Sequence, residues 1–311
     1  MTSINQIKVE PDNSGLVELY HLLKPRVMWL AVYTAAVGMI LAPGETNLFF
    51  CIVSIFCISV GAGAAGVLNM WWDQEVDKLM LRTSNRPLPS GNISPDDAFV
   101  YGISLSIFSV MFLGLVANWL SAFLLAFTIF FYGVIYSMLL KKRTVQNIVI
   151  GGAAGAMPPV IGWLAITGNF SVEPILLFGL IFFWTPPHFW ALSVVMKDDY
   201  QRANIPMFPV IYGIQETRTK IFQYTFLILA CSQLVAFSSV GGLLFFIISN
   251  ILNAYLLYLS FKIFRKRSTS DWNLELKFFK FTIVYLFLFF GTLVIQDVIG
   301  SNDMQSFYWL I

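Results

Sequence analysis

Long apolar runs separated by short polar segments make up most of the chain. A helix needs about 20 apolar residues to cross the hydrocarbon layer of a membrane, and about nine runs of suitable length and composition follow one another. They lie at 26–42, 48–68, 98–117, 119–140, 147–167, 174–196, 219–240, 243–264 and 279–299. The pattern therefore predicts an all-α integral membrane protein with about nine transmembrane helices.

The overall composition supports this class. Of the 311 residues, 58% are hydrophobic and 12% are charged, whereas charged residues make up about a quarter of a soluble globular protein. No polar stretch is long enough to form a separate domain. We therefore expect a cytoplasmic N-terminal segment over residues 1–23 and a single transmembrane domain over residues 24–311.

The basic residues predict the orientation of the chain. If it crosses the membrane nine times, all 19 lysine and arginine residues fall on one side. They precede the first run, follow the second and the fourth, and lie between the sixth and seventh and around the connection from the eighth to the ninth. Because cytoplasmic loops carry the excess of these residues, we expect the N-terminus inside the cell and the C-terminus outside.

The start of the chain and its net charge narrow the cellular setting. Glu10, Asp12 and Glu18 are unlike the residues of a secretory signal or an organelle transit peptide, so a bacterial inner (plasma) membrane fits best. A net charge of +2 does not indicate nucleic-acid binding. Membrane lipid is the expected environment.

A stripe of polar residues follows the second run. Asn69, Asp73 and Asp77 recur every four residues, so they share one face if the helix continues past the apolar run. Two carboxylates and an amide oxygen are hard ligands that suit Mg²⁺ together with a phosphate-bearing substrate. Arg82 and Arg86 follow at a distance suited to phosphate oxygens. The alternative is a solvated helix end whose acids pair with nearby bases.

A second acidic segment follows the sixth run, on the same side of the membrane. Asp198 and Asp199 are adjacent there and Arg202 follows. Opposed across a cavity open to the cytoplasmic face, the two acidic segments would hold two Mg²⁺ ions and neutralise a diphosphate. We therefore expect active-site loops near 69–97 and 197–218. Taken alone, the second segment is equally compatible with a solvated helix end.

Two further features lie on or near this side of the membrane. Lys141, Lys142 and Arg143 form a basic run that is typical of a topology signal or a lipid contact, with phosphate binding as the alternative. His188 precedes Lys197 by nine residues in the sixth run, which places it about 13 Å below the membrane surface. An ionisable residue at that depth is a candidate for function; a neutral histidine bonded to a neighbouring helix is the alternative.

Proline pairs predict irregular helices in two of the runs. Pro186 and Pro187 remove backbone donors from the sixth run, so we expect a local break in the backbone hydrogen-bond ladder whose free carbonyls line a cavity. In the fifth run, the glycine-rich stretch 151–159 ends in Pro158 and Pro159. Its small residues allow either close helix packing or room for a bulky ligand, and packing is the preferred interpretation.

The polar stripe also carries a family resemblance. Asn69-xxx-Asp73-xxx-Asp77, followed by Arg82 and Arg86, resembles the first signature of the UbiA-type intramembrane prenyltransferase superfamily. A fuller set of segments resembles one branch of it, the protohaem IX farnesyltransferase (haem O synthase) family. They are 24–26, 69–91, 141–147 running into 151–162, 184–190, 198–200 and 206–209.

The resemblance implies a prenyl transfer dependent on Mg²⁺, with farnesyl diphosphate as donor, haem B as acceptor and haem O as product after addition of water. By this resemblance, Asn69, Asp73 and Asp77 would bind Mg²⁺ and diphosphate, and Asp198 and Asp199 would form a second metal site. The four aspartates would be the catalytic carboxylates. The implied haem contact is His188, and the basic residues implied near the diphosphate are Arg26, Arg82, Arg86, Lys141 and Arg202.

Two departures and two rival functions accompany the resemblance. Asp198 is followed four residues later by Arg202, where the superfamily often has a second aspartate, so the second metal site is less well supported. Asn204 stands where this branch usually has glycine, which is expected to alter a turn and not the chemistry.

One rival function is that of a prenyltransferase acting on a quinone precursor or another tetrapyrrole. The weaker rival is an ion-coupled transporter. Transporters carry charges deep within their spans, whereas the acidic residues of this chain cluster at one membrane surface. An obligate oxidase partner is not implied; transient contact with haem-handling or oxidase-assembly proteins stays open.

Overall fold

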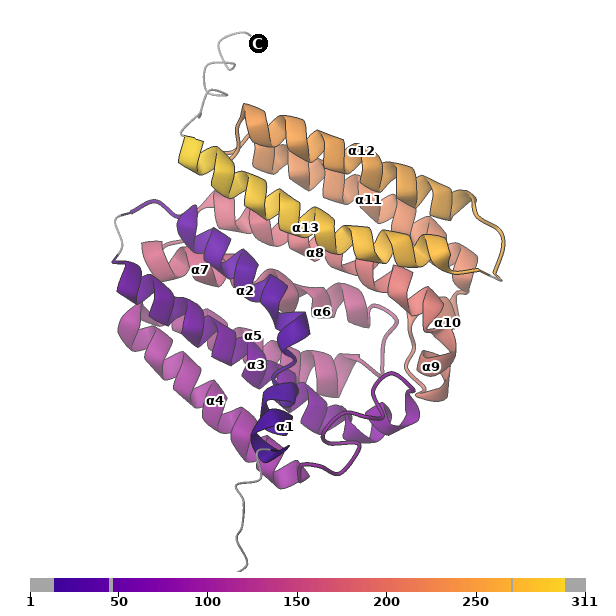
Figure 1. Cartoon of the computed structure of the whole chain (residues 1–311). Coiled ribbons are helices and arrows are strands. Elements are labelled where there is room, and N and C mark those ends of the chain that lie inside the picture. The colour runs from indigo at the N-terminus through magenta and orange to yellow at the C-terminus, as the bar shows by residue number, and fades with distance from the viewer. Residues whose placement is uncertain (1–13, 45–46, 270, 300–311) are drawn as a thin grey trace, which may run out of the picture.

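The computed structural model describes residues 14–44, 47–269 and 271–299, and within these ranges every regular element is helical (Figure 1). The elements are α1 (Ser14–Leu22), α2 (Pro25–Ile40), α3 (Leu48–Leu79), α4 (Pro95–Val116), α5 (Trp119–Phe130), the π-helix η1 (Phe131–Leu140), α6 (Asn147–Ala156), α7 (Pro158–Thr167), α8 (Val172–Val195), α9 (Lys197–Arg202), α10 (Phe208–Ile211), α11 (Ile214–Ala236), α12 (Leu243–Arg265) and α13 (Asn273–Ile299). The predicted all-α class is confirmed.

All nine predicted runs coincide with apolar helices. In the described part of the chain, 8 helices are long and apolar enough to cross a membrane, with α5 and η1 forming one of them and α6 and α7 another. The first predicted run corresponds to α2, which is apolar but has only 16 residues. The protein is therefore a multi-pass membrane protein, while the number of crossings and their direction stay predictions. Residues 1–13 of the predicted N-terminal segment lie outside the described residues.

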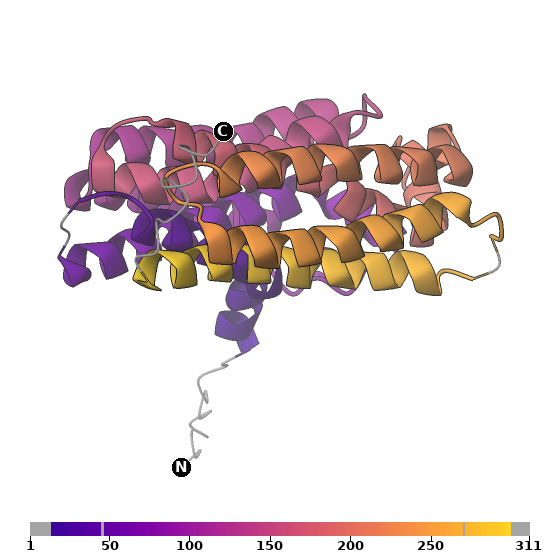
Figure 2. The same cartoon turned by 90° about the horizontal axis from the view of Figure 1, so that it is seen from above.

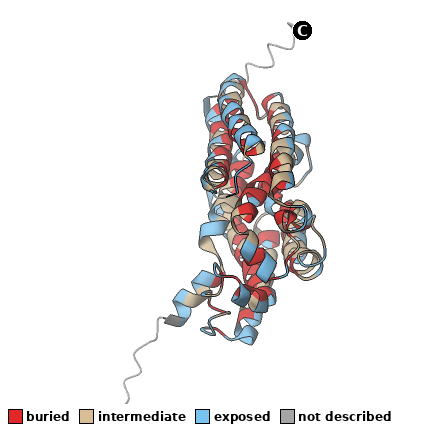
Figure 3. Cartoon of the chain, turned by 90° about the vertical axis from the view of Figure 1, so that its right-hand side faces the viewer, coloured by how far each residue is buried: buried red, intermediate tan, exposed pale blue. Residues whose placement is uncertain are grey.

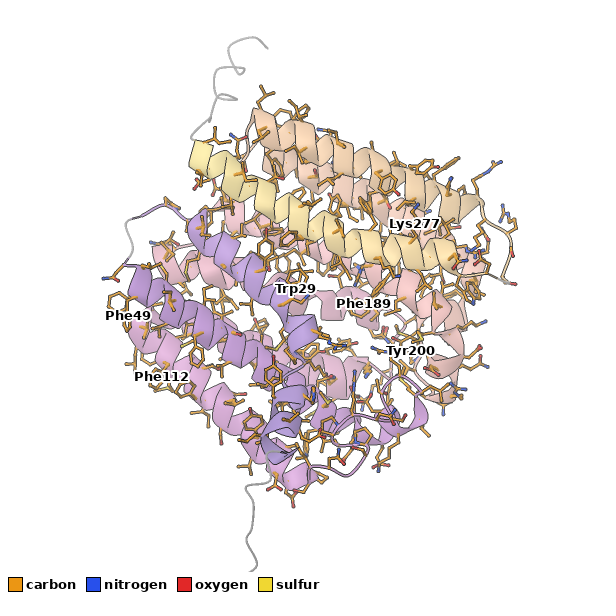
Figure 4. The ribbon with its side chains drawn as sticks, in the orientation of Figure 1. Trp29, Phe49, Phe112, Phe189, Tyr200 and Lys277 are labelled. Atoms are coloured by element: carbon orange, nitrogen blue, oxygen red, sulfur yellow. The ribbon has the colours of Figure 1, made fainter. Side chains whose placement is uncertain are left out.

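The long helices run roughly along one common direction, and their connections divide between the two ends of the bundle (Figure 1). The polar connections that follow α3, η1, α8 and α12 lie at one end, and the short connections lie at the other. Figure 2 shows that α1 projects from the side of the bundle. The buried residues gather between the helices and the exposed residues face outward (Figure 3). Exposed aromatic residues such as Phe49 and Phe112 lie on the outer side (Figure 4), as expected for a lipid-facing surface.

The helix that carries the polar stripe is longer than its apolar run. α3 continues for 32 residues to Leu79, beyond the apolar run that ends at residue 68. Met80 then adopts an extended conformation and ends the helix. The condition under which Asn69, Asp73 and Asp77 share one face is therefore met.

The fourth span changes its helical form halfway along. α5 is regular, and the following residues form the π-helix η1, whose bonds run from residue i to residue i−5. The Lys141 N–H accordingly donates to the Tyr136 carbonyl at 2.9 Å, and the Ser137 hydroxyl donates to the Tyr132 carbonyl at 2.8 Å. The apolar pattern predicts only a continuous span here, so the π-helix is a finding of the structure.

The two proline pairs behave differently. The fifth span does divide into α6 and α7 at Met157, before Pro158 and Pro159, as expected. α8, by contrast, continues through Pro186 and Pro187 as one helix. Pro186 and Pro187 still contribute no backbone N–H, so the ladder loses two donors without ending the helix.

α2 and α7 approach each other backbone to backbone through two glycines. A Cβ added at Gly38 would overlap the Pro159 carbonyl, and one added at Gly162 would overlap the Ala35 carbonyl. Small residues permit such close approach of helices in membranes. This contact ties the first span to the second half of the fifth.

We expect Gly162→Ala to lower the free energy of unfolding by about 1–3 kcal/mol, because the two helices must separate to admit a methyl group. The measurement is the apparent melting temperature in detergent. Gly155→Ala on α6 is the control, since an added Cβ there meets no atom within 4 Å. Equal melting temperatures for the two variants would contradict the tight contact.

Candidate active site

The polar stripe of α3 lies inside the protein. Asn69 is 5% exposed, Asp73 1% and Asp77 3%. The alternative of a solvated helix end is therefore wrong for this segment. A buried carboxylate needs a compensating positive charge, and the structure supplies several.

Asn69 and Asp73 share one hydrogen-bonded group. Lys24 Nζ donates to Asn69 Oδ1 at 2.6 Å, and Asn69 Nδ2 donates to Asp73 Oδ2 at 2.7 Å and to Ser137 Oγ at 2.8 Å. Lys141 Nζ forms an ion pair with Asp73 Oδ2 at 2.6 Å. The site therefore assembles residues from the α1–α2 junction, α3 and the end of η1.

Asp77 is paired by the segment that follows α3. Arg86 Nη1 lies 2.6 Å from Asp77 Oδ2. The Thr83 hydroxyl donates to the Asp77 backbone carbonyl at 2.9 Å, which ties this segment back to the end of the helix. Arg82, by contrast, is exposed and makes no hydrogen bond or ion pair with any described residue. Of the two predicted arginines, the structure brings only Arg86 to the stripe.

Lys24 is the residue of the N-terminal junction that reaches the site. Sequence reasoning chose Arg26, which is exposed and has no polar partner among the described residues. Lys24 adopts a left-handed backbone conformation with φ 53°, which is uncommon for a residue other than glycine. The pKa of Lys24 is lowered to about 7, chiefly by burial and then by the charge of Arg86, whereas Asp77 and Asp73 act in the opposite direction. The signal in the sequence that could have indicated Lys24 was its place directly before Pro25, because proline favours the first position of a helix and so marks Lys24 as the residue of the turn that precedes it.

Two tyrosines of η1 also belong to this region and were missed. The rings of Tyr132 and Tyr136 stack with centroids 5.4 Å apart. Both tyrosines lie near Asp73, and Tyr136 also lies near Tyr200 of α9, which is labelled in Figure 4. A Cβ at Gly151 would overlap the Tyr136 ring, so the glycine of α6 makes room for it. The only signal in the sequence was a pair of aromatic residues four apart, shortly before Lys141.

The second acidic segment is only partly turned inward. Asp199 is buried and forms an ion pair with Arg202 within α9. Asp198 is exposed and has no polar partner among the described residues. Asn204 has φ 53°, a left-handed conformation that glycine adopts freely and that asparagine tolerates better than most residues.

Mg²⁺ fits the donor set of the α3 stripe. Asp73 Oδ1 is buried and has no hydrogen-bond partner, which leaves a hard oxygen available as a ligand. No three acidic, histidine or cysteine side chains cluster as a metal site within the described ranges. Protein groups alone therefore do not complete a coordination shell, and a substrate diphosphate would supply further oxygens, as is usual for Mg²⁺.

His188 lies apart from the acids, on α8. Its side chain is buried and its Nδ1 lies 2.7 Å from Thr282 Oγ1 of α13. The ring stacks against Trp184, with centroids 4.3 Å apart, and against Phe279, with centroids 4.5 Å apart. The neighbouring Phe189 is partly exposed and lies near the middle of the molecule (Figure 4). The histidine is thus bonded to a neighbouring helix, and one of its two nitrogens is used.

Solved structures share this fold. One described as a UbiA homolog from Archaeoglobus fulgidus bound to DMAPP and Mg²⁺ superposes with a TM-score of 0.69 at 20% identity, covering 89% of this chain and 99% of that one. A second, described as a digeranylgeranylglyceryl phosphate synthase, gives a TM-score of 0.74 at 17% identity over 91% and 98% of the two chains.

Proteins of known name are similar over almost the whole length. A protoheme IX farnesyltransferase of Rhodopseudomonas palustris (strain BisB5) is 50% identical over 292 residues, 92% of each chain. One of Paracoccus denitrificans is 47% identical over 295 residues, 94% of this chain and 97% of the relative. The model of the UbiA prenyltransferase family matches residues 31–293. Because that match takes in most of the sequence, the chain belongs to the UbiA prenyltransferase family.

Proposed function

We propose that this protein transfers the farnesyl group of farnesyl diphosphate to a vinyl group of haem B and, with addition of water, forms haem O and diphosphate. Relatives named protoheme IX farnesyltransferase at 47–50% identity support the substrates. The observation that carries the chemistry is the buried α3 stripe with Lys24, Arg86 and Lys141 bonded to it. Two carboxylates and an amide among three basic side chains form a site for a metal and a diphosphate together.

The metal would be held by Asn69, Asp73 and Asp77. When bound, Mg²⁺ would neutralise the diphosphate and make it a better leaving group. Lys141 and Arg86 compensate the acids in the described structure. With the acids engaged by a metal, both bases are free to turn toward phosphate oxygens, for which guanidinium and ammonium groups are suited.

Bond changes in this reaction follow from the chemistry of an allylic diphosphate. The C–O bond to diphosphate breaks, diphosphate leaves with the electron pair, and a vinyl carbon of the haem attacks C1 of the farnesyl cation. Water then adds its oxygen to the resulting cation and releases a proton. Aromatic faces stabilise cations, and the stacked rings of Tyr132 and Tyr136 near Asp73 are placed for this role.

An apolar groove beside Lys24 suits the farnesyl chain. It has a volume of about 560 Å³, and its lining includes Leu23 and Pro25, the two neighbours of Lys24, together with Met28 and Trp29. If the diphosphate of the donor is bound at the stripe, the farnesyl chain attached to it can extend into this groove. The proposal assigns the groove to the donor and leaves the region around His188 to the acceptor.

The remaining predicted residues have weaker support. Asp198 and Asp199 are proposed as a second metal site, with Arg202 as a phosphate ligand released from Asp199. Arg82 and Arg26 are exposed and would need to move to reach a diphosphate. We further propose one prenyltransferase domain over 24–311 in a bacterial inner membrane. Its substrates would be haem B and farnesyl diphosphate.

The test is a reconstituted reaction of the full chain with haem B, farnesyl diphosphate and Mg²⁺, with extracted haems analysed by mass spectrometry. We expect a new haem heavier by one farnesyl group and one hydroxyl group, and no such product with EDTA. A folded preparation that binds farnesyl diphosphate but forms no such haem would overturn the proposal. Prenylation of a quinone precursor under the same conditions would favour the rival prenyltransferase.

A further inference from the structure

The surroundings of the His188 ring leave one atom without a partner. Trp184 and Phe279 stack at interplanar angles of 16° and 23° to the ring, and the Nδ1 edge meets Thr282. Among the described residues, nothing forms a hydrogen bond with Nε2. The His188 side chain as a whole is only 7% exposed, but its Nε2 is not among the fully buried side-chain atoms that lack a hydrogen-bond partner, so this atom stays accessible to a ligand.

The hydroxyl of Thr282 determines which ring nitrogen carries the proton. Thr282 Oγ1 donates its only hydrogen to the Phe279 carbonyl at 2.7 Å. Its contact with His188 Nδ1 must therefore be one in which Nδ1–H donates and the hydroxyl accepts. A neutral imidazole protonated at Nδ1 carries its lone pair on Nε2.

Thr282 is itself held in place on both sides. Its backbone carbonyl accepts a hydrogen bond from Trp184 Nε1 at 2.9 Å, and its side chain is fully buried. One threonine of α13 therefore orients both the indole and the imidazole of α8. The two rings stack in parallel as a consequence.

We propose that Thr282 is a positioning residue that fixes His188 with its proton on Nδ1, so that Nε2 serves as an axial ligand to the iron of the acceptor haem. The inference rests on the proposed function, because it takes haem as the acceptor. A metal-binding histidine commonly donates its other N–H to an oxygen acceptor, which fixes the tautomer and raises the basicity of the ligand. The Trp184 and Phe279 rings hold the imidazole plane, and hence the direction of the Nε2 lone pair.

The experiment uses the purified full chain with ferrous haem B and no farnesyl diphosphate. Resonance Raman spectroscopy measures the iron–histidine stretching band, and a titration measures haem affinity. The chain contains only two histidines, so His188→Ala should abolish the band, whereas His21→Ala, at an exposed site on α1, should leave it unchanged.

Thr282→Val keeps the shape of the side chain and removes the acceptor. We expect it to shift the iron–histidine band to lower frequency and to weaken haem binding by about tenfold. Thr282→Ser keeps the hydroxyl and should retain the wild-type band. Thr292→Val is the matched control, because Thr292 is a buried threonine of the same helix whose hydroxyl bonds, among the described residues, only to the Leu288 carbonyl.

Binding of the unreactive analogue farnesyl thiolodiphosphate with Mg²⁺ shows whether each variant is folded. A band that persists in His188→Ala, or a Thr282→Val variant with wild-type band and affinity, would overturn the inference. Haem O formation by a wild-type protein that shows no iron–histidine band would overturn the inference alone. If the wild type shows the band but forms no haem O, the proposed function fails and the haem site stands.

Discussion

Asp73→Asn is expected to lower the rate of haem O formation by about 10²- to 10³-fold, the loss typical when one stabilising group is removed from a reaction centre. The substitution keeps the size of the side chain and removes the charge that pairs with Lys141 at 2.6 Å. It also removes the carboxylate whose Oδ1 has no partner and is available to a metal. The measurement is the initial rate of product formation at saturating Mg²⁺.

Glu75→Gln provides the matched control for this loss. Glu75 lies on α3 between the two site aspartates, but its side chain is 74% exposed and pairs with Lys78 on the surface. Exposed pairs of this kind contribute little, so the control should retain the wild-type rate. A near-normal rate in Asp73→Asn, or activity in the double variant Asp73→Ala, Asp77→Ala, would remove the metal assignment.

Glu275→Ala is expected to lower the free energy of unfolding by about 3–5 kcal/mol, because it leaves a buried guanidinium without its counter-charge. Glu275 and Arg218 are both fully buried. Glu275 accepts from Arg218 Nε at 2.9 Å and from Arg218 Nη2 at 2.5 Å, and Lys266 Nζ lies 2.8 Å from its other oxygen. This group joins α11, α13 and the segment after α12.

The measurement for Glu275→Ala is unfolding in detergent followed by intrinsic tryptophan fluorescence. Glu216→Ala is the comparison, since Glu216 is an exposed acid on α11 and should change the midpoint very little. A midpoint for Glu275→Ala equal to that of Glu216→Ala would show that the buried ion pair does not stabilise the protein.

The helices and the acidic stripe could be predicted from the sequence because both depend on local spacing. Long apolar runs predict helices that face lipid. Polar residues that recur every four positions are predicted to share one face of a helix, whether or not the residues that contact that face are known. Asn69, Asp73 and Asp77 therefore needed no tertiary information beyond the continuation of α3. The ion pairs of Asp77 with Arg86 and of Asp73 with Lys141 are findings of the structure, because the spacing along one helix does not name partners from other segments.

Long-range partners could not be predicted in the same way. Lys24 and Asn69 are 45 residues apart in the sequence, and His188 and Thr282 are 94 residues apart. A local sequence pattern contains no information about contacts over such separations. The sequence does not show that Lys24, and not Arg26, points into the site. The left-handed backbone conformation that directs Lys24 inward depends on how α1 and α2 meet in the folded protein. The course of the chain through Pro186 and Pro187 also depends on tertiary context, since surrounding helices keep α8 continuous where an isolated helix would break.

The π-helix η1 makes the length of the fourth span matter as much as its composition. Each residue of a regular helix turns the chain by about 100°, and η1 holds a different rotation over Phe131–Leu140. Ser137 and Lys141 reach Asn69 and Asp73 only with that rotation in place. Loss of one residue within η1 would turn both side chains away from α3, even if every remaining residue were unchanged. Insertions and deletions should therefore be tolerated much less in this segment than conservative replacements of its apolar residues.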